Sequence, residues 1–266
     1  MKDDALNDDA MNGGALPPDR RFATTLARGL SVLRAFRPSD DGLGNAEIAS
    51  RTGLPKSTVS RLTFTLRELG YLTGAPGDRY RPGPSLLVLG NTAAAVNSWL
   101  ERAGPAMQRL ADETRTMALL LVRDGDKMLI ARTWRPSGVA SIWLETGHRL
   151  PFAGTSSGHT LLSALDAPQA ASIAALPAAH LDRIRAEGLA QLTTRGFVIT
   201  DPAQYYAPGI HAVAVPFRPD GAAEPVIFTC GAVPEMLPVA RMEAEIGPAL
   251  RDAVRGLDRL TPRETR

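Results

Sequence analysis

The chain has 266 residues, of which 44% are hydrophobic, and a formal net charge of +2, so it is long enough for two domains with separate cores. Its single cysteine, Cys230, excludes an internal disulfide and favours a cytoplasmic location. The acidic start lacks the apolar region of a signal peptide, and no run is long and apolar enough for a transmembrane helix. A secreted or membrane-spanning protein is therefore not expected.

Charge is distributed unevenly along the chain. Residues 1–19 contain five aspartates and no apolar periodicity, which predicts a disordered acidic tail. Residues 20–84 contain eleven arginines and lysines against five acids, a net charge of 11 − 5 = +6. A basic segment joined to a neutral remainder is typical of a DNA-binding domain attached to a second domain. We therefore expect a DNA-binding domain over residues 20–83.

The first helix of this domain is predicted over residues 25–36, and a loop rich in turn-forming residues follows at 37–42. Apolar residues at steps of three and four usually mark the buried face of a helix. The residues that form this stripe are Leu26, Leu30 and Leu33.

Residues 44–62 predict two short helices joined by a tight turn. Asn45 is a suitable N-cap for the first helix, Gly53 can end it with a positive φ, and Pro55 suits the start of the second. This is the helix-turn-helix arrangement, in which the second helix enters the DNA major groove. The second helix is expected to bury the stripe Val59, Leu62, Leu66 and Leu69 and to end at Gly70.

The polar face of the second helix starts with small and basic residues, where helix N–H groups and the dipole favour phosphate. A hairpin over residues 71–81, with its turn at 74–78, adds a wing with two arginines on one side. Ser57, Thr58 and Arg61 are expected to contact bases or phosphates, and Lys56, Arg79 and Arg81 to contact phosphates. The alternative is a polar helix face that is only solvated. The candidate DNA-binding residues are Lys56, Ser57, Thr58, Ser60, Arg61, Arg79 and Arg81.

After Pro82-Gly83-Pro84, a linker helix is predicted within residues 84–100. Its surface is apolar and rich in alanine, more so than packing against one small domain requires. The residues alone leave two interpretations open, packing within the monomer and pairing with a second subunit.

Residues 101–266 predict an α+β domain built on an antiparallel sheet. A helix to about Thr114 is followed by two apolar strands around Asp124-Gly125-Asp126, a strong hairpin signal, and by a third strand at 141–145. Helices are expected at about 156–165, 168–175 and 177–190, strands at 197–200, 211–217 and 224–231, and a closing helix at 238–258.

The segment Thr155-Ser156-Ser157-Gly158 opens one of these helices. Its small residues leave backbone N–H groups accessible, so a carboxylate could bind at the helix N-terminus, although a plain N-cap would have the same sequence. Phe228 and Cys230 are two residues apart on a strand and therefore share a face. That face could line a pocket or belong to the core.

An enzyme is the main alternative class. Residues 154–158 match G-x-S-x-G, and the order Ser156, Asp201, His211 is that of an α/β-hydrolase triad. The preceding residues 149–153 are short and contain a proline, a poor central strand, and no strand-helix alternation builds a parallel sheet before them. We therefore do not expect an enzyme. The four histidines show no metal-ligand spacing, and no nucleotide-binding glycine pattern occurs, so neither a metal nor another cofactor is expected.

Several segments in the right order resemble the IclR family of bacterial transcriptional regulators. They are residues 28–33, 47–49, 56–62 and 69–72, with 150–158 and 208–216 resembling two signature loops of the family's effector domain. The resemblance implies a winged helix-turn-helix, a linker helix and a GAF-like effector domain. It further implies a dimer or tetramer that binds double-stranded DNA at a roughly palindromic operator, controlled by a small organic acid.

Carried over by position, the resemblance makes the amides of Ser156 and Ser157 the ligands of the acid. Asp201 falls near the family's pocket acid, in a loop at 201–209 that is one residue longer here. Phe228 and Ala212 replace polar or sulfur-bearing residues of some relatives, which favours an apolar effector such as an aromatic acid. The remaining pocket candidates are Val139, Ile142, Leu150, Ile210 and Cys230.

Overall fold

The computed structural model describes residues 21–138, 142 and 144–259. The chain forms two compact units, residues 1–96 and 97–266, and each is described by itself. The predicted acidic tail, residues 1–19, lies outside the described residues, and so does the pocket candidate Val139.

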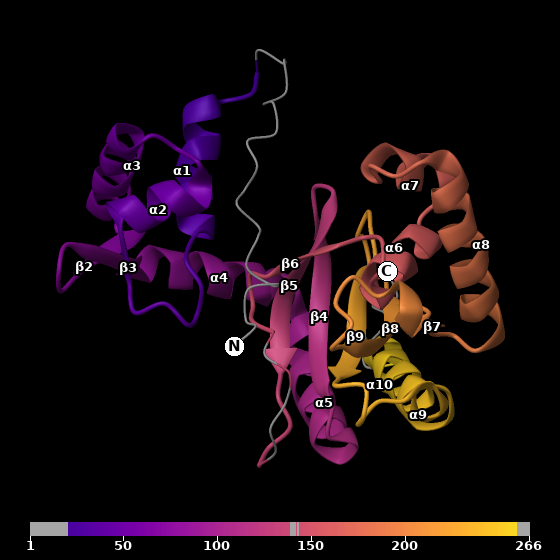
Figure 1. The fold of residues 1–266 in the computed structure, drawn as a ribbon. Helices are drawn as coiled ribbons and strands as arrows, with labels where there is room; N and C mark the ends of the chain where they lie inside the picture. The colour runs from indigo at the N-terminus through magenta and orange to yellow at the C-terminus, as the bar shows by residue number, and fades with distance from the viewer. Residues whose placement is uncertain (1–20, 139–141, 143, 260–266) are drawn as a thin grey trace, which may run out of the picture. The chain divides into compact units, whose positions relative to one another are not determined.

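The first unit combines three short helices with a small antiparallel sheet (Figure 1). The helices are α1 (Thr24–Arg34), α2 (Asn45–Thr52) and α3 (Lys56–Glu68). The sheet has the order β1-β3-β2, with β1 at Leu43–Gly44, β2 at Leu72–Ala75 and β3 at Arg79–Pro82. Its buried core is Val32, Ala35, Leu43, Ile48, Val59 and Leu72. The helix-turn-helix and the wing hairpin are thus confirmed, and β1 is an additional strand.

The turn between α2 and α3 forms as predicted, but the cap before α2 does not. Gly53 ends α2 with φ 68°. Asn45 is already the first helical residue; the N-cap is Gly44, whose N–H donates to the Glu47 carboxylate over 2.8 Å. The Asn45 side chain instead accepts a hydrogen bond from the buried Thr63 hydroxyl at 3.0 Å, which joins α2 to α3.

The predicted apolar stripes of α1 and α3 are only partly buried. Leu26 and Leu30 are 64% and 50% exposed, while Gly29 and Val32 form the buried face of α1. This face of α1 packs near α3, since a Cβ at Gly29 would make an ordinary van der Waals contact with Leu62 at 3.9 Å. On α3, Leu69 is exposed at the last turn, where the helix has already left the core.

Helix α4 (Pro84–Val96) closes the first unit and buries none of its residues within it. Its large apolar side chains are 52–79% exposed: Leu87, Val88, Leu89 and Val96. In the described residues of the chain, no helix is both long and apolar enough to cross a membrane.

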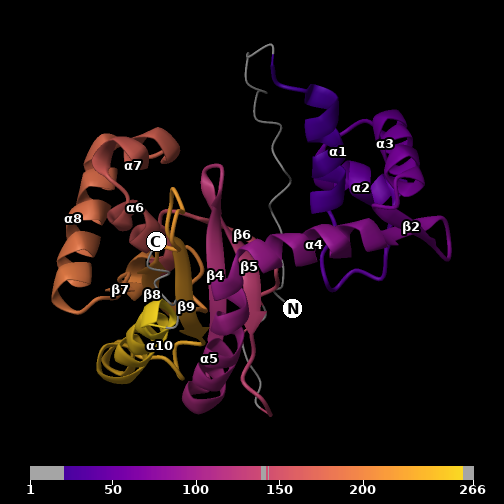
Figure 2. The same cartoon turned by 180° about the vertical axis from the view of Figure 1, so that it is seen from behind.

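The second unit is a six-stranded antiparallel sheet with helices on both faces, which confirms the α+β class (Figures 1 and 2). The strand order is β6-β5-β4-β9-β8-β7. The strands are β4 (Met117–Asp124), β5 (Lys127–Trp134), β6 (Arg149–Pro151), β7 (Val198–Ile199), β8 (His211–Phe217) and β9 (Val226–Ala232). The helices are α5 (Ser98–Thr114), α6 (Ser156–Ala164), α7 (Ala167–Ile173), α8 (Ala178–Thr194), α9 (Val239–Arg241) and α10 (Gly247–Arg259).

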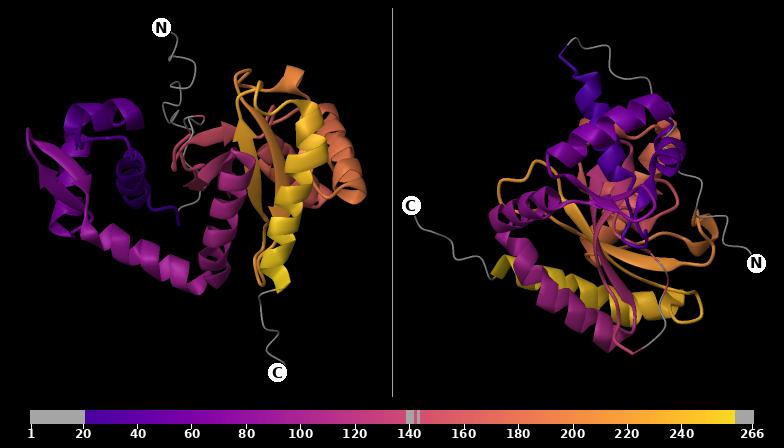
Figure 3. Two further views of the ribbon diagram at one scale, coloured as in Figure 1. Left: turned by 90° about the horizontal axis from the view of Figure 1, so that it is seen from below. Right: turned by 90° about the vertical axis from the view of Figure 1, so that its left-hand side faces the viewer.

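Each face of this sheet has its own core. On one face α5 and α10 lie side by side and pack on the sheet through residues such as Met107, Leu250 and Phe228 (Figure 3). On the other face, α6 and α8 pack through Leu161 and Ile184. Alternate residues of the central strands therefore enter different cores, because side chains alternate across a sheet.

The three described residues of the strand predicted at 141–145 are not in a strand. Ser141 and Trp143 lie outside the described residues, and Ile142, Leu144 and Glu145 have irregular backbone. The Arg135 guanidinium donates to the carbonyl groups of Ile142 and Leu144 at 3.0 and 2.9 Å, so these acceptors are satisfied without a neighbouring strand. The edge strand beside β5 is β6 instead.

Candidate functional site

The N-terminal part of α3 presents most of the predicted DNA-binding residues to solvent. Val59 and Thr63 are fully buried on the opposite side of the helix and fix its orientation on α2. Pro55 precedes the helix, and the first N–H groups of a helix have no intrahelical acceptor. The exposed candidates are Lys56, Ser57, Ser60 and Arg61, and Thr58 is half-buried.

The two wing arginines have acidic partners within the first unit. Arg79 donates to the Gly42 carbonyl at 2.7 Å and to the Glu47 carboxylate at 3.0 Å. The Gly44 N–H, together with Arg79, holds the pKa of Glu47 below its usual range. Arg81 pairs with Asp41. A DNA phosphate would therefore compete with these ion pairs for both arginines.

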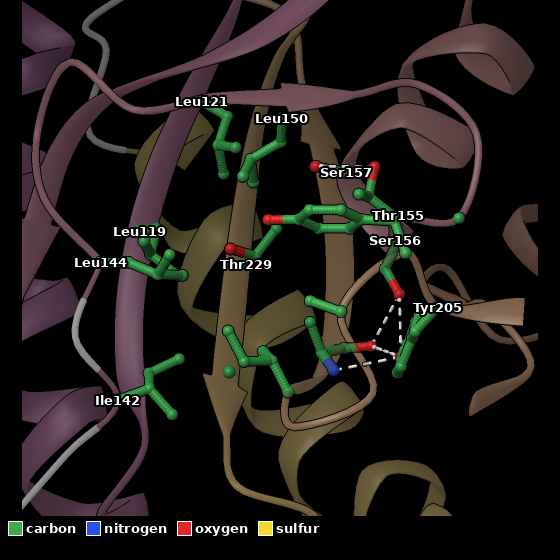
Figure 4. Close-up of a pocket in the computed structure, with 16 residues that line it drawn as sticks. Leu119, Leu121, Ile142, Leu144, Leu150, Thr155, Ser156, Ser157, Tyr205 and Thr229 are labelled. Atoms are coloured by element: carbon green, nitrogen blue, oxygen red, sulfur yellow. Dashed lines mark hydrogen bonds between the residues drawn. The ribbon is translucent and has the colours of Figure 1, made fainter. Parts of the chain in front are cut away.

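The second unit contains a pocket between the sheet and the N-terminus of α6 (Figure 4). Its walls come from β4, the segment around residue 142, β6, the start of α6, the loop before β8, and strands β8 and β9. Six predicted effector-binding residues line it: Ile142, Leu150, Ser156, Ser157, Ile210 and Ala212. The other described lining residues are Leu119, Leu121, Leu144, Gly154, Thr155, Tyr205, Tyr206, Ala207, Thr229 and Gly231.

The start of α6 is tightly held. The Thr155 hydroxyl accepts from the Gly158 N–H at 3.0 Å and donates to the Pro151 carbonyl at 2.8 Å. A Cβ at Gly158 would lie 2.2 Å from the Phe152 carbonyl oxygen, so only glycine allows this approach. The N-cap thus uses one amide of the first turn and leaves those of Ser156 and Ser157, which line the pocket, without an intrahelical acceptor.

The hydroxyl groups of Ser156 and Tyr205 both form hydrogen bonds within the protein beside the pocket. Each donates to the Ala212 carbonyl over 2.7 Å, and the Tyr205 oxygen accepts from the Ala212 N–H at 3.1 Å. Ser156 also accepts from the Thr200 N–H at 3.2 Å. Burial raises the pKa of Tyr205, so its hydroxyl stays protonated at neutral pH. Neither hydroxyl has a second proton for a ligand.

The hydrolase alternative fails on this geometry. The only proton of the Ser156 hydroxyl is donated to Ala212. Asp201 accepts from the Ala203 N–H at 3.0 Å and is exposed, and His211 Nδ1 lies 2.8 Å from the Leu237 carbonyl oxygen. The three side chains therefore form no triad.

The structure places three of the pocket candidates outside this pocket. Phe228 and Cys230 do share a face, but it is the face packed against α5 and α10. Asp201 lies outside the pocket because it caps the short 3-10 helix Pro202–Gln204.

Strand β9 contributes Thr229 and Gly231 to the pocket instead. The sequence analysis also missed Tyr205 and the β4 residues Leu119 and Leu121. Alternation along β4 and β9 could have identified four of these five residues if the face that meets α6 had been known. Among the described residues, no group of three or more His, Cys, Asp and Glu side chains could hold a metal ion.

Comparison with known proteins places both units in the same protein family. Residues 25–76 match the family model described as the IclR helix-turn-helix domain, and residues 93–259 match that of the bacterial transcriptional regulator IclR C-terminal domain. The Pca regulon regulatory protein of Pseudomonas putida is 37% identical over 153 residues, 57% of this chain and 52% of that protein. The chain thus matches about half the length of this relative.

Solved structures extend the similarity over most of the chain. An IclR family transcriptional regulator from Brucella abortus has 32% identity and a TM-score of 0.68, covering 94% of this chain and 96% of that chain. An IclR homolog from Microbacterium hydrocarbonoxydans, complexed with 4-hydroxybenzoate, has 22% identity and a TM-score of 0.66, with 88% and 100% covered. At that identity the likeness concerns the fold. Because the relatives are named as regulators, the expectation that the chain is not an enzyme is confirmed.

Proposed function

Since this chain belongs to the IclR family of bacterial transcriptional regulators, we propose that it binds a roughly palindromic operator as a homo-oligomer and responds to an aromatic acid. The observation that carries DNA recognition is the exposure of Ser57, Ser60 and Arg61 on the first turns of α3, opposite the buried Val59. Side chains at this end of a recognition helix reach base edges and phosphates in the major groove. Because such a regulator acts on the chromosome, a cytoplasmic location is part of the proposal.

The homo-oligomer, a dimer or a tetramer, is supported by uncovered apolar surface. Helix α4 exposes Leu87, Val88 and Val96, and α1 exposes Leu26 and Leu30. Burying such side chains against a second copy is favourable by about 25 cal/mol for each Å² of apolar surface. A twofold axis would place two recognition helices in adjacent major grooves, which is why a palindromic operator follows.

The effector is proposed to bind in the pocket of the second unit, which we interpret as a GAF-like sensor domain. The amides of Ser156 and Ser157 and the dipole of α6 favour a carboxylate there. The leucines of β4 and Leu150 offer an apolar surface for a ring. The complex of a structural neighbour with 4-hydroxybenzoate makes this compound a suitable first probe.

The proposal is tested by a mobility-shift titration of the full chain on the DNA upstream of its own gene, against scrambled competitor, at two salt concentrations. We expect binding that resists the competitor and weakens as salt rises, because phosphate contacts release counterions. Addition of 4-hydroxybenzoate should shift the protein concentration at which half of the DNA is bound. Equal binding to scrambled DNA, or none at either salt concentration, would overturn specific recognition.

A further inference from the structure

The described lining of the effector pocket offers only one position for a negative charge. It contains no Asp, Glu, Lys, Arg or His side chain, and half of its residues are aliphatic. A carboxylate at the start of α6 meets the amides of Ser156 and Ser157. A second carboxylate, elsewhere in the pocket, would lose its hydration without gaining a charged partner, which is strongly unfavourable.

Three hydroxyl groups near that position donate their protons to other groups of the protein. Ser156 and Tyr205 direct both of their protons to the Ala212 carbonyl. The Thr155 hydroxyl donates to the Pro151 carbonyl, and its oxygen caps Gly158. The ligand therefore cannot accept a hydrogen bond from these three side chains.

Thr229 is different. Only 3% of this residue is exposed, and it lies on β9 among the pocket-lining residues. Figure 4 shows its side chain in the pocket, on the sheet side, with Leu119 and Leu144 nearby. Its cross-strand neighbours are Leu119 and Ala214, which have no polar side-chain atom.

The Thr229 hydroxyl makes no hydrogen bond within the part of the chain that the structure describes. Its oxygen is not among the described side-chain atoms that are fully buried without a partner, so it reaches the open space of the pocket. A polar group on a bound ligand would satisfy this hydroxyl. Thr229 is thus a second polar feature of the pocket, independent of the helix N-terminus.

We propose that Thr229 makes this pocket selective for aromatic acids with one carboxylate and one neutral hydrogen-bonding substituent, such as a ring hydroxyl. This rests on the proposed function, because it assumes that the pocket binds an aromatic acid. The carboxylate occupies the start of α6, the ring packs on the leucines of β4 and β6, and the substituent bonds to Thr229. Dicarboxylates are disfavoured because their second charge has no partner.

The test is calorimetric titration of the full chain with four probes: benzoate, 3-hydroxybenzoate, 4-hydroxybenzoate and terephthalate. We expect at least one hydroxybenzoate to bind about tenfold more tightly than benzoate, the effect of one neutral hydrogen bond. Terephthalate should bind at least about tenfold more weakly than that hydroxybenzoate. Thr229→Val, which keeps the shape and removes the hydroxyl, should bring the ratio of the hydroxybenzoate and benzoate affinities close to one.

Thr229→Ser is the matched control, because it keeps the hydroxyl and should keep the preference. Circular dichroism establishes that both variants are folded. If the acids bind but the wild type shows no preference, or Thr229→Val retains it, the role of Thr229 is refuted while the effector class stands. If none of the four probes binds, the aromatic-acid effector is itself refuted, and the selectivity with it.

Discussion

The hydroxyl groups of Ser156 and Tyr205 lie 3.2 Å apart and both donate to the Ala212 carbonyl. Ser156 is the first residue of α6, Tyr205 belongs to the loop before β8, and Ala212 belongs to β8. Three segments that surround the pocket are therefore joined at one carbonyl group. The loop is further held by the Tyr206 N–H, which donates to the Gly154 carbonyl at 3.0 Å. The loop is therefore held both by the Tyr205 hydroxyl and by a backbone hydrogen bond.

Tyr205→Phe should loosen the loop without removing the ring. The Ala212 N–H loses its acceptor, so we expect a loss of about 1–2 kcal/mol in the free energy that holds the loop in place. Hydrogen exchange should accelerate in residues 202–212, and the affinity for the effector should fall. Tyr80→Phe, in the other unit, is the control. Unchanged exchange in the loop would show that the ring alone holds it.

Two glycines in helices of the second unit should respond oppositely to alanine. Gly158→Ala places a Cβ 2.2 Å from backbone of Phe152 and should lower the free energy of unfolding by about 3 kcal/mol. At Gly256, within α10, a Cβ meets nothing within 4 Å, so alanine should stabilise by about 0.5–1 kcal/mol. All three tryptophans of the chain fall within residues 97–266, so urea titrations followed by tryptophan fluorescence report on this unit. Equal effects of the two substitutions would contradict the tight contact.

The sequence was sufficient for the fold where the pattern was local. Helix spacing, Gly53 and the Asp124-Gly125-Asp126 turn each determine their own surroundings, and the structure has those elements. The sequence was insufficient where the secondary structure of a segment depended on a residue distant in the chain. Strand β1 has two residues and exists only because β3 pairs with it, and Ile142 and Leu144 are not in a strand because Arg135 binds their carbonyl groups.

The errors at the candidate site have the same origin. Alternation correctly grouped Phe228 with Cys230, but no local feature of β9 indicates which helix pair covers which face. The polar Thr229 and the small Gly231, which alternate with Phe228 and Cys230, were the available signal for a pocket face. Asp201 next to Pro202 is a typical cap of a short helix, and capping accounts for it without a ligand.

His159 should make the stability of the second unit dependent on pH. Burial, together with His180 and Arg183, lowers its pKa from 6.5 to about 4, while in the unfolded chain it remains near 6.5. Between these values the unfolded state binds more protons, so stability is present above pH 6.5 and is lost as pH falls towards 4. From pH 7 to pH 5 the loss from this residue is about 2 kcal/mol.

The measurement is the free energy of unfolding at pH 7 and pH 5 for the wild type and for His159→Gln. In the wild type, His159 Nε2 accepts a hydrogen bond from the Gly154 N–H at 3.3 Å. Glutamine offers a side-chain carbonyl oxygen as the acceptor in its place. Carboxylates titrate in both proteins, so the difference between the two pH dependences isolates the histidine. Identical dependences in the two proteins would show that the pKa of His159 is the same in the folded and the unfolded chain.

Arg61 is the residue whose substitution best separates base reading from general attraction to DNA. It is exposed on the second turn of α3 and is free of the acidic partners that hold Arg79 and Arg81. If it contacts a guanine with both terminal nitrogens, Arg61→Ala should cost about 1–3 kcal/mol on the operator and less on random DNA. Arg61→Lys should recover little of this loss, because lysine keeps the charge but not the paired donors.

The matched control is Arg67→Ala, which removes the same charge from the last turn of α3, where Arg67 pairs with Glu68. Mobility shifts on operator and scrambled DNA, at two salt concentrations, give the four affinities needed for each variant. If Arg61 contacts only a phosphate, Arg61→Ala should instead lower the affinity for both DNAs equally. The salt dependence of binding should then fall by about one charge. Arg61→Lys would then bind nearly as well as the wild type, and base recognition would have to come from Ser57, Thr58 or Ser60.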